Sequence, residues 1–465
     1  MQPVLTVAEM QAVDAAAQAT TPVEVLVERA GTAVAVAALE MMAGAYGRRV
    51  VVVAGKGNNG ADGRVAAAVL RRRGARVTLV EPGSVGVLPA ADLVIDAAYG
   101  TGFRGEYRAP TVAPGTPVLA VDIPSGVLGD SGRAPGTVLP ADRTVTFAAL
   151  KPGLLQGDGL SLAGMVSVAD IGLPAEGARA HLVGDADVTF LVPPRRREDN
   201  KWSSAVLVVA GSPGMTGAAG MCARAALRAG AGMVRLGVPG GDVADSPAAE
   251  AVGVALPAHG WAEMALGEAE RCRAIVVGPG LARHPSTAAE VRRLVTGTAV
   301  PLVVDADGLF ALGRLDDGEP LRSEGTVVLT PHDGEYRRLL GDPPGPDRIA
   351  AARRLATAGG AVALVKGGPT VVADPAGRAL VATAGSARLA TAGTGDVLSG
   401  VIGAFLARGV APLEAAALAA HVHGRAAGRG PAEGLMAGDL PDLISSFLSD
   451  LRLTDLSRTE GGHRD

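Results

Sequence analysis

The chain has 465 residues, which is enough for two to four domains that each bury a core. Apolar residues make up 48%, which excludes a disordered chain, and the net charge of −4 argues against an electrostatic nucleic-acid binder. Two cysteines, Cys222 and Cys272, exclude a disulfide framework and a cysteine zinc site. Neither a signal peptide nor a membrane-spanning run is visible, so we expect a soluble, cytoplasmic protein.

The first half of the chain predicts alternating helices and strands. Helices are expected at 6–18 and 22–45, followed by a Val-rich strand at 49–54, a glycine loop and a helix that ends near residue 73. The further strands are expected at 76–80, 91–95, 118–121, 144–147 and 165–168. Continuous apolar strands that alternate with helices predict a parallel sheet covered on both faces.

A segment rich in Pro and Arg, 193–200, separates this half from a second α/β pattern. The predicted domains are therefore 1–195 and 196–455, with a polar tail at 456–465. Strands of the second domain are expected at 204–209, 274–277, 301–304, 326–329 and 361–365. Its helices are expected at 218–229, 333–340, 347–357, 394–407 and 412–427. No repeat of fixed period occurs, so we expect two different α/β domains.

The run GKGNNGADG at 55–63 follows the first buried strand. Gly55, Gly57 and Gly60 satisfy the G-x-G-x-x-G pattern of dinucleotide binding, and Glu81 at the end of the next strand could hold a ribose. An NAD-dependent dehydrogenase is therefore one hypothesis. The pattern alone is weak evidence, and two adjacent amides and Asp62 are unusual inside it.

Polar groups also follow two later strands, in DAAYGTGFRGE (96–106) and VDIPSG (121–126). Because the carboxyl ends of parallel strands meet at one crevice, Asn59, Asp96 and Ser125 could offer oxygens to one hard cation. Asp122 is a candidate acid/base. The alternative is that each of these residues only caps a helix or stabilises a turn.

The second half lacks a Walker-type phosphate loop, but ATAGTGDVLSG at 390–400 offers another way to bind phosphate. Gly393, Thr394 and Gly395 open an apolar helix, and the free amides of a helix N-terminus bind anions. Asp396 would repel a phosphate, so its expected role is to deprotonate an attacking hydroxyl or to protonate a leaving group. The alternative is a simple helix cap.

Only four lysines occur among 43 basic residues, and Lys366 directly precedes GGPT after a predicted strand. We expect its ammonium to reach a nucleotide phosphate. His332 lies in TPHDGE before a helix, where a structural role is the commoner alternative. The lysine–glycine turn and the GTGD helix start together predict a split nucleotide site of the ribokinase type.

The first half resembles the YjeF N-terminal family, the NAD(P)H-hydrate epimerases, in LVERAG (26–31), GKGNNGADG, DAAYGTGFRG, VDIPSG and TFAALKPG (146–153). The resemblance implies a Rossmann-like three-layer αβα domain, K⁺ on Asn59, Asp96 and Ser125, and Asp122 as the substrate-contacting acid/base. Further substrate contacts are implied for Asn58, Asn59, Gly60, Ala61, Asp62, Gly100, Thr101, Gly102, Phe103, Arg104, Gly105 and Glu106. The chain departs from the family at Arg29, where Asn is usual, and at Ala61, where Gly is usual.

The second half resembles the YjeF C-terminal family, the ADP- or ATP-dependent NAD(P)H-hydrate dehydratases of the ribokinase-like αβα fold. The runs that carry this likeness are residues 210–232, VVGPGL, VDADGL, LTPHDGE, VKGGPT and AGTGDVLSGVIGAFLARG. Implied hydrate contacts are Gly280, His332 and Asp396. Implied contacts to ADP or ATP with Mg²⁺ are Lys366, Gly367, Gly368, Pro369, Thr370, Gly393, Thr394 and Gly395.

Together these features predict a bifunctional enzyme that epimerises the R and S hydrates (NADHX and NADPHX) and dehydrates the S form. The expected route is phosphorylation of the C6 hydroxyl by ADP or ATP, followed by phosphate elimination. The alternative is a ribokinase-like small-molecule kinase fused to an inactive metabolite-binding domain, with Arg29 obstructing the first site. Small-molecule partners and a homo-oligomer are expected, and neither nucleic acid nor a membrane.

Overall fold

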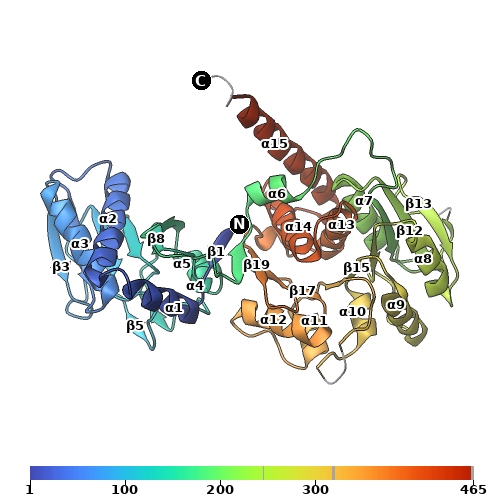
Figure 1. Cartoon of the computed structure of the whole chain (residues 1–465), viewed down its shortest axis with the longest axis horizontal. Coiled ribbons are helices and arrows are strands. Elements are labelled where there is room, and N and C mark those ends of the chain that lie inside the picture. The colour runs from blue at the N-terminus through green and yellow to red at the C-terminus, as the bar shows by residue number, and fades with distance from the viewer. Residues whose placement is uncertain (244–245, 317–319, 462–465) are drawn as a thin grey trace. The chain divides into compact units, whose positions relative to one another are not determined.

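The computed structural model describes residues 1–243, 246–316 and 320–461, the stretch from 455 on as backbone only. It divides into two compact units, an N-terminal unit of Gln2–His181 and a C-terminal unit of Met1 with Leu182–Asp465 (Figure 1). No helix in the described ranges is both long enough and apolar enough to cross a membrane.

The N-terminal unit is built on one parallel sheet of order β3-β2-β4-β6-β8-β9. Its strands are β2 (Arg49–Ala54), β3 (Arg76–Val80), β4 (Leu93–Ala97), β6 (Val118–Val121), β8 (Arg143–Phe147) and β9 (Met165–Ala169). Shorter strands are β1 (Gln2–Val4), β5 (Tyr107–Arg108), β7 (Gly136–Thr137) and β10 (Ala180–Leu182). The helices are α1 (Val7–Gln18), α2 (Val23–Met42), α3 (Asn58–Arg72), α4 (Pro152–Leu155) and α5 (Gly159–Leu162).

The two faces of this sheet bury alternate residues of β2. Val50 and Val52 pack against α2 and α3, whereas Val51 and Val53 pack into a second cluster formed with loop residues such as Leu88. The central strands are buried on both faces, which explains why they are continuous apolar runs without alternation. The loops at the carboxyl ends of β2, β4 and β6 are therefore held at one edge of the sheet.

The C-terminal unit contains a larger sheet in which β13-β12-β11-β14-β15-β16-β17 run parallel and β18 and β19 continue antiparallel. The parallel strands are β11 (Ala205–Val209), β12 (Met233–Pro239), β13 (Val252–Leu256), β14 (Ala274–Val277), β15 (Leu302–Val304), β16 (Val327–Leu329) and β17 (Val362–Val365). The antiparallel pair is β18 (Thr370–Ala373) and β19 (Ala379–Ala382).

Helices lie on both sides of this sheet, with α13 and α14 on one side and α10, α11 and α12 on the other (Figure 1). The first half of the set is α6 (Asp185–Leu191), α7 (Gly217–Arg228), α8 (Trp261–Ala269), α9 (Pro285–Gly297) and α10 (Asp307–Leu312). The second half is α11 (Asp333–Leu340), α12 (Arg348–Gly359), α13 (Thr394–Ala407), α14 (Pro412–Ala427) and α15 (Leu440–Gly461), with short 3₁₀ turns η2 (Ala387–Leu389) and η3 (Ala437–Asp439). The apolar face of α13 packs against α7 and α14 in the main core.

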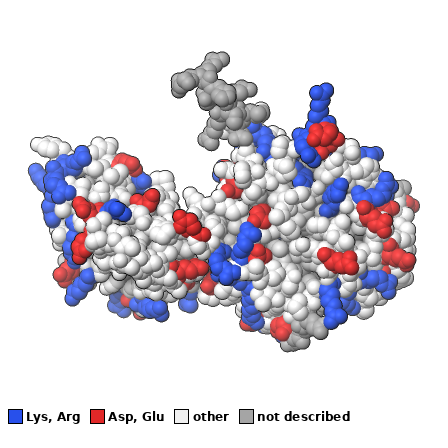
Figure 2. Space-filling view, viewed as in Figure 1, with Lys and Arg blue, Asp and Glu red and all other residues white. Residues whose placement is uncertain are grey.

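The predicted α/β fold class is confirmed, and the predicted strands and helices coincide with observed ones to within about three residues. The division between the units falls at His181, before the segment 193–200 in which we expected the boundary. The expected polar tail is helical as far as Gly461, and 462–465 lie outside the described residues. On the face that Figure 2 shows, basic and acidic side chains are interspersed without a continuous basic band.

Candidate active sites

The N-terminal unit contains a cavity of about 800 Å³ at the carboxyl edge of its sheet. Loops that follow β2, β3, β4 and β6 line it on one side, and α1 closes it on another with Met10, Asp14 and Gln18. Of the predicted substrate contacts, those that line the cavity are Asn58, Asn59, Asp62, Gly100, Thr101, Gly102, Phe103 and Asp122. The others, Gly60, Ala61, Arg104, Gly105 and Glu106, lie outside its lining.

Two glycines of the 55–63 run are required by close packing. A Cβ at Gly55 would lie 2.0 Å from the carbonyl oxygen of Ala98, and one at Gly60 would lie 1.9 Å from that of Gly55. A side chain at Gly55 would push the loop after β2 away from the loop after β4, and one at Gly60 would push the first turn of α3 away from Gly55. These glycines allow the start of α3, at Asn58 and Asn59, to lie against the Gly100 loop. The glycine spacing is therefore explained by packing, without dinucleotide binding.

Asp122 is the most fully partnered carboxylate of the cavity. Its Oδ1 lies 2.8 Å from Nζ of Lys151 and accepts from Oγ1 of Thr146 (3.1 Å), and its Oδ2 accepts from the amide and hydroxyl of Thr101. Burial acts to raise the pKa of Asp122, but the Lys151 ammonium and the Thr101 hydrogen bonds outweigh it and lower the pKa. Asp122 is therefore an ionised base held at a fixed position, with φ of 68°.

Asp62, on α3, has the opposite environment. Within the described ranges its carboxyl group has neither an ion pair nor a hydrogen bond, and only 6% of the residue is exposed. Burial, with the charges of Asp122 and Asp14 adding to it, raises the pKa of Asp62 to about 8. Burial also raises the pKa of Asp14, against the pull of Lys151. The cavity thus holds one ionised and at least one protonated carboxyl group at neutral pH.

Asp96 and Ser125 are hydrogen-bonded to each other and lie outside the lining of the cavity. The amide of Ser125 donates to Oδ2 of Asp96 at 2.9 Å, and the hydroxyl of Ser125 accepts from the amide of Tyr99. Asp96 is fully buried with no cationic partner in the part of the chain that the structure describes, and burial raises its pKa against the Ser125 hydrogen bonds. The side-chain amide of Asn59 is also buried, with neither Oδ1 nor Nδ2 partnered. The unpartnered Oδ1 of Asn59 and the uncompensated Asp96 carboxyl group fit a monovalent cation.

Arg29 does not obstruct the cavity. Its guanidinium donates to the carbonyl oxygen of Ile171 at 2.9 Å, and Arg29 is absent from the residues that line the cavity. Ala61 does not line the cavity either. The alternative of an inactive N-terminal domain rested on Arg29 blocking the cavity, and the structure does not support that blockage.

In the C-terminal unit, the GTGD run forms the start of α13. Gly393 is the N-cap, in the left-handed region with φ of 90°, and no side chain caps the helix. Asp396 occupies the third position of the first turn, so it is not the simple helix cap of the alternative interpretation. A Cβ on Gly395 would lie 3.3 Å from Nζ of Lys366, which shows how closely the helix tip and that lysine approach.

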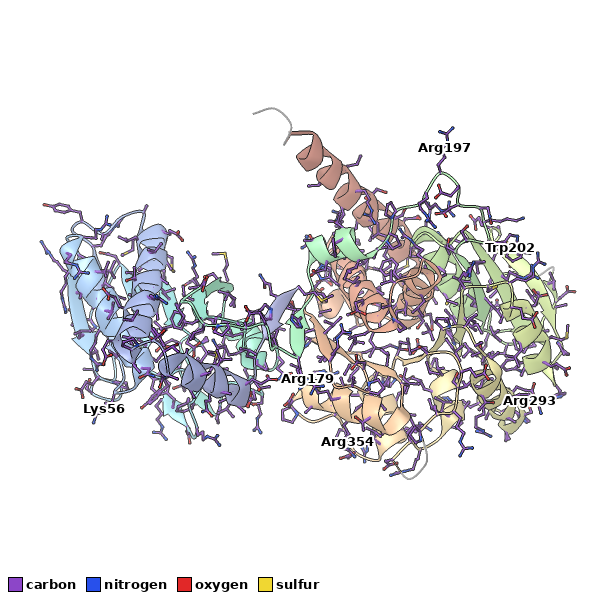
Figure 3. The ribbon with its side chains drawn as sticks, in the orientation of Figure 1. Lys56, Arg179, Arg197, Trp202, Arg293 and Arg354 are labelled. Atoms are coloured by element: carbon purple, nitrogen blue, oxygen red, sulfur yellow. The ribbon has the colours of Figure 1, made fainter. Side chains whose placement is uncertain are left out.

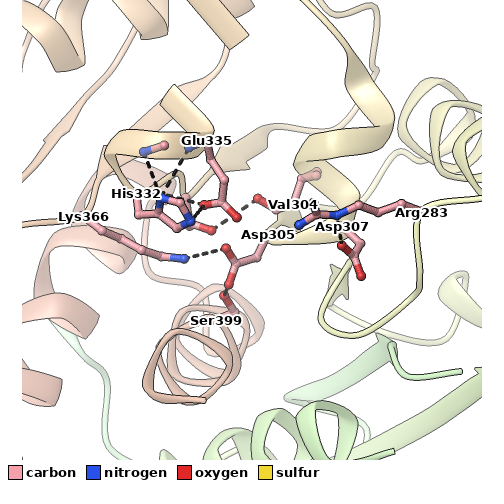
Figure 4. A network of polar contacts seen from close by, with 10 residues as sticks. Arg283, Val304, Asp305, Asp307, His332, Glu335, Lys366 and Ser399 are labelled. Atoms are coloured by element: carbon pink, nitrogen blue, oxygen red, sulfur yellow. Dashed lines mark hydrogen bonds and ion pairs between the residues drawn. The ribbon is translucent and has the colours of Figure 1, made fainter. Parts of the chain in front are cut away.

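A buried network joins this tip to the ends of two strands (Figure 4). Lys366, which follows β17, places Nζ 2.6 Å from Oδ1 of Asp305, and Oδ2 of Asp305 accepts from the hydroxyl of Ser399 on α13 at 2.7 Å. Burial raises the pKa of Asp396 to about 6, with the charge of Asp305 adding to the shift and that of Lys366 opposing it. Asp396 has no hydrogen-bond partner in the described ranges, so it remains available to a ligand.

His332 is the N-cap of α11. Its Nδ1 accepts from the amides of Gly334 (2.9 Å) and Glu335 (3.3 Å), and its own amide donates to Glu335. Capping the helix, the structural role expected as the alternative, occupies Nδ1. The other ring nitrogen, Nε2, lies 3.6 Å from the Glu335 carboxylate, and the His332 side chain is 61% exposed.

The remaining predicted residues of the C-terminal unit lie in glycine turns. Gly280 follows β14 with φ of 66°. In the Lys366–Thr370 turn, the hydroxyl of Thr370 donates to the carbonyl oxygen of Gly367 at 3.1 Å. Arg348 donates to the carbonyl oxygen of Lys366 and pairs with Asp333 at 3.1 Å, which fixes the start of this turn.

Sequence reasoning missed five residues that the structure brings into the sites: Asp14, Thr146, Lys151, Asp305 and Ser399. The rarity of lysine pointed to Lys366, yet the lysine that is almost fully buried, 1% exposed, is Lys151. The rarity of lysine in the sequence could have identified Lys151 as well. Asp305 directly follows a short strand of leucine and valine, much as Asp96 lies at the end of β4, and that parallel could have identified it.

Both halves of the chain match known protein families. The family described as NAD(P)H-hydrate dehydratase matches residues 206–449, and the YjeF-related protein N-terminus matches 23–87 and 83–153. The Bifunctional NAD(P)H-hydrate repair enzyme Nnr of Salinibacter ruber is 38% identical over 95% of this chain and 95% of its own length. The Mycobacterium leprae protein of the same name is 38% identical over 96% and 98%.

A solved ribokinase-like superfamily protein from Enterococcus faecalis has the same fold as the C-terminal unit. It covers 59% of this chain and 96% of its own, with a TM-score of 0.51 at 22% identity. The Salinibacter and Mycobacterium relatives align with this chain across both units. The chain therefore belongs to the family of bifunctional NAD(P)H-hydrate repair enzymes.

Proposed function

We propose that the protein repairs hydrated NADH and NADPH, with the N-terminal unit as the epimerase and the C-terminal unit as the dehydratase. The observation that carries the proposal is the unpartnered Asp396 carboxyl group in the first turn of a glycine-opened helix, beside the Asp305–Lys366 pair. ADP or ATP is the expected phosphoryl donor, entering as its Mg²⁺ complex.

The dehydratase step follows from the poor leaving ability of hydroxide. Asp396 takes the proton of the C6 hydroxyl, and the oxygen attacks the terminal phosphoryl group while the bond to the rest of the nucleotide breaks. The phosphate ester then leaves C6, a proton is lost from C5, and the ring double bond returns. Free amides at the α13 tip and the Lys366 ammonium would stabilise charge on the transferred group, and the closeness of Gly395 to Nζ of Lys366 supports this role.

The epimerase step requires that the hydroxyl leave C6 and that water return on the other face. One group must protonate the departing oxygen, and another must accept a proton from the incoming water. We assign the acceptor role to ionised Asp122 and the donor role to Asp62, because their environments push their pKa values apart. The ring nitrogen stabilises the intermediate cation, so no redox step is needed.

Asn59, Asp96 and Ser125 would hold K⁺ next to this cavity, as the buried, unpartnered Asn59 amide and the uncompensated Asp96 carboxyl group support. The ion would supply the positive charge that Asp96 lacks and would fix the loop that carries Asn58. Removing K⁺ is expected to weaken hydrate binding without unfolding the sheet.

The test is incubation of the full chain with mixed R and S hydrates and either ADP or ATP, followed at the absorbance of the reduced nicotinamide. Full recovery is expected, together with release of phosphate. A stable phosphorylated product without recovery of absorbance would instead support a small-molecule kinase. Cytoplasmic location, homo-oligomeric assembly and the choice between ADP and ATP stay predictions.

A further inference from the structure

A second cavity, of about 340 Å³, lies in the C-terminal unit and has no part in the sites described above. It is formed where the segment 193–204 enters β11. The residues that line it are Pro193, Pro194, Arg195, Arg196, Asp199, Ser203, Ser204, Arg273 and Arg408. We call it the arginine pocket.

The arginine pocket lies at the opposite edge of the sheet from the catalytic groups. Ser204 directly precedes β11 and Arg273 directly precedes β14, so both mark the amino ends of parallel strands. Asp305 and Lys366 follow the carboxyl ends of β15 and β17. Strands of four residues separate the two edges by roughly 13 Å at about 3.3 Å per residue. The arginine pocket is therefore separate from the catalytic groups.

The positive charge of the pocket is not neutralised within it. The Arg408 guanidinium donates to two backbone carbonyls, of Ala229 (3.0 Å) and of Pro193, which orient it without cancelling its charge. Over the described ranges, the side chains of Arg195 and Arg273 make neither an ion pair nor a hydrogen bond. Arg196 lies 3.6 Å from the carboxylate of Glu198 and 3.7 Å from that of Asp199, so the charges left without an acidic partner are those of Arg195, Arg273 and Arg408.

Asp199 is already engaged. Its Oδ2 accepts from the backbone amide of Arg196 at 2.9 Å, and its Oδ1 lies 3.7 Å from that residue's guanidinium. Burial lowers the pKa of Arg408 to about 10, and the charges of Arg452 and Arg195 act in the same direction. The guanidinium remains charged at neutral pH among like charges, an arrangement that an anion would relieve.

We infer that the arginine pocket is a binding site for a phosphate-bearing anion, held by the Arg195, Arg273 and Arg408 guanidinium groups. Guanidinium groups bind phosphate oxygens through charge-assisted hydrogen bonds, and the carbonyl oxygens of Ala229 and Pro193 hold the Arg408 guanidinium in a fixed orientation. The volume accommodates either free orthophosphate or the phosphate group of a nucleotide monoester. Both are products of a reaction that transfers and then releases phosphate.

The loop itself provides a matched control. Arg197, two residues from Arg195, extends from the body of the unit in Figure 3 and does not line the pocket. Arg293 on α9 is likewise outside it. The variant R195A/R273A and the control R197A/R293A therefore remove the same charge from the full chain, but only the first removes it from the pocket.

Titration calorimetry of the full chain with orthophosphate, and separately with AMP, at constant ionic strength tests the site. Wild type and R197A/R293A should show the same binding events, and R195A/R273A should lose one of them or show it at least about tenfold weaker, because binding at the α13 tip is common to all three. All three should keep the same melting temperature and the same turnover of S hydrate. Binding of AMP alone would identify a phosphate ester as the ligand. Equal affinity in all three proteins, or binding of neither probe, would overturn the inference.

Discussion

The role of Asp396 follows from its lack of a hydrogen-bond partner among the described residues. Its carboxyl group has no hydrogen-bond partner in the described part of the chain, and the helix cap belongs to Gly393. Asp396→Asn should lower dehydration of the S hydrate by about 10²–10⁴-fold, the usual contribution of one positioned proton acceptor. Nucleotide affinity, measured by calorimetry, should not fall, because the amide group removes a negative charge near the phosphates. The exposed Asp342, paired with Arg354, provides the control: Asp342→Asn should keep full activity.

The pH dependence of dehydration follows from the same residue. A proton acceptor works only when ionised, and the pKa of Asp396 is raised to about 6. Turnover at saturating nucleotide should therefore fall about tenfold for each pH unit below 6 and level off above it. A rate that stays constant down to pH 4.5 would mean that another group takes the proton.

Lys151 affects both the stability of the N-terminal unit and the charge state of Asp122. It is almost fully buried, and its ammonium bonds to Asp122, Thr146 and the Phe147 carbonyl oxygen. Lys151→Met leaves Asp122 buried without a counter-charge, so it should lower the free energy of unfolding by about 3–5 kcal/mol at neutral pH. The loss should shrink as the pH falls and Asp122 becomes protonated, because protonation removes the uncompensated charge. Urea unfolding at pH 7 and pH 4 measures both effects, and Lys151→Met/Asp122→Asn should regain part of the stability.

A substitution at the start of α13 distinguishes an effect on nucleotide binding from an effect on stability. Gly395 has ordinary helical backbone, so alanine fits the helix and should stabilise it by about 0.4–1 kcal/mol. The new Cβ would nevertheless lie 3.3 Å from Nζ of Lys366 and would cover part of the amide tip. Gly395→Ala should therefore weaken nucleotide binding about tenfold or more while the melting temperature holds or rises.

The control for that variant is another helical glycine. Gly267 on α8 has open space where a Cβ would be placed. Gly267→Ala should raise the melting temperature in the same way and leave nucleotide affinity unchanged. If both variants bind nucleotide as wild type does, the α13 tip is not the phosphate site.

The elements also show where sequence patterns were informative. Buried parallel strands such as β2, β6 and β14 were predicted with correct bounds, because a short apolar run between turn residues has the length of a strand and is too short for a helix. The patterns missed β12 and β13, of which β13 lies at the sheet edge with alternating burial. They also missed the antiparallel β18 and β19, which follow a turn already assigned to nucleotide binding. Motifs located the ends of strands, but not the long-range pairs. Lys366 and Asp305 are 61 residues apart, and only the register of β15, β16 and β17 brings them together.

For the whole molecule, the two compact units predict separable activities in one chain. Each site is lined by residues of its own unit, so inactivating one should leave the other intact. The chain with Asp122→Asn should recover only the S fraction of mixed hydrates, apart from spontaneous epimerisation. The chain with Asp396→Asn should recover none, while still interconverting the R and S forms.

Mixing those two variants is the sharper measurement. If hydrates pass between sites through solution, the Asp396→Asn chain supplies S hydrate to the Asp122→Asn chain, and the mixture should recover the full reduced-nicotinamide absorbance. The rate should rise in proportion to the concentration of the Asp396→Asn chain. Direct transfer within one chain predicts instead that the mixture stays much slower than an equal amount of wild type, even with the Asp396→Asn chain in excess. Because each unit packs its own core around its own sheet, we expect complementation through solution.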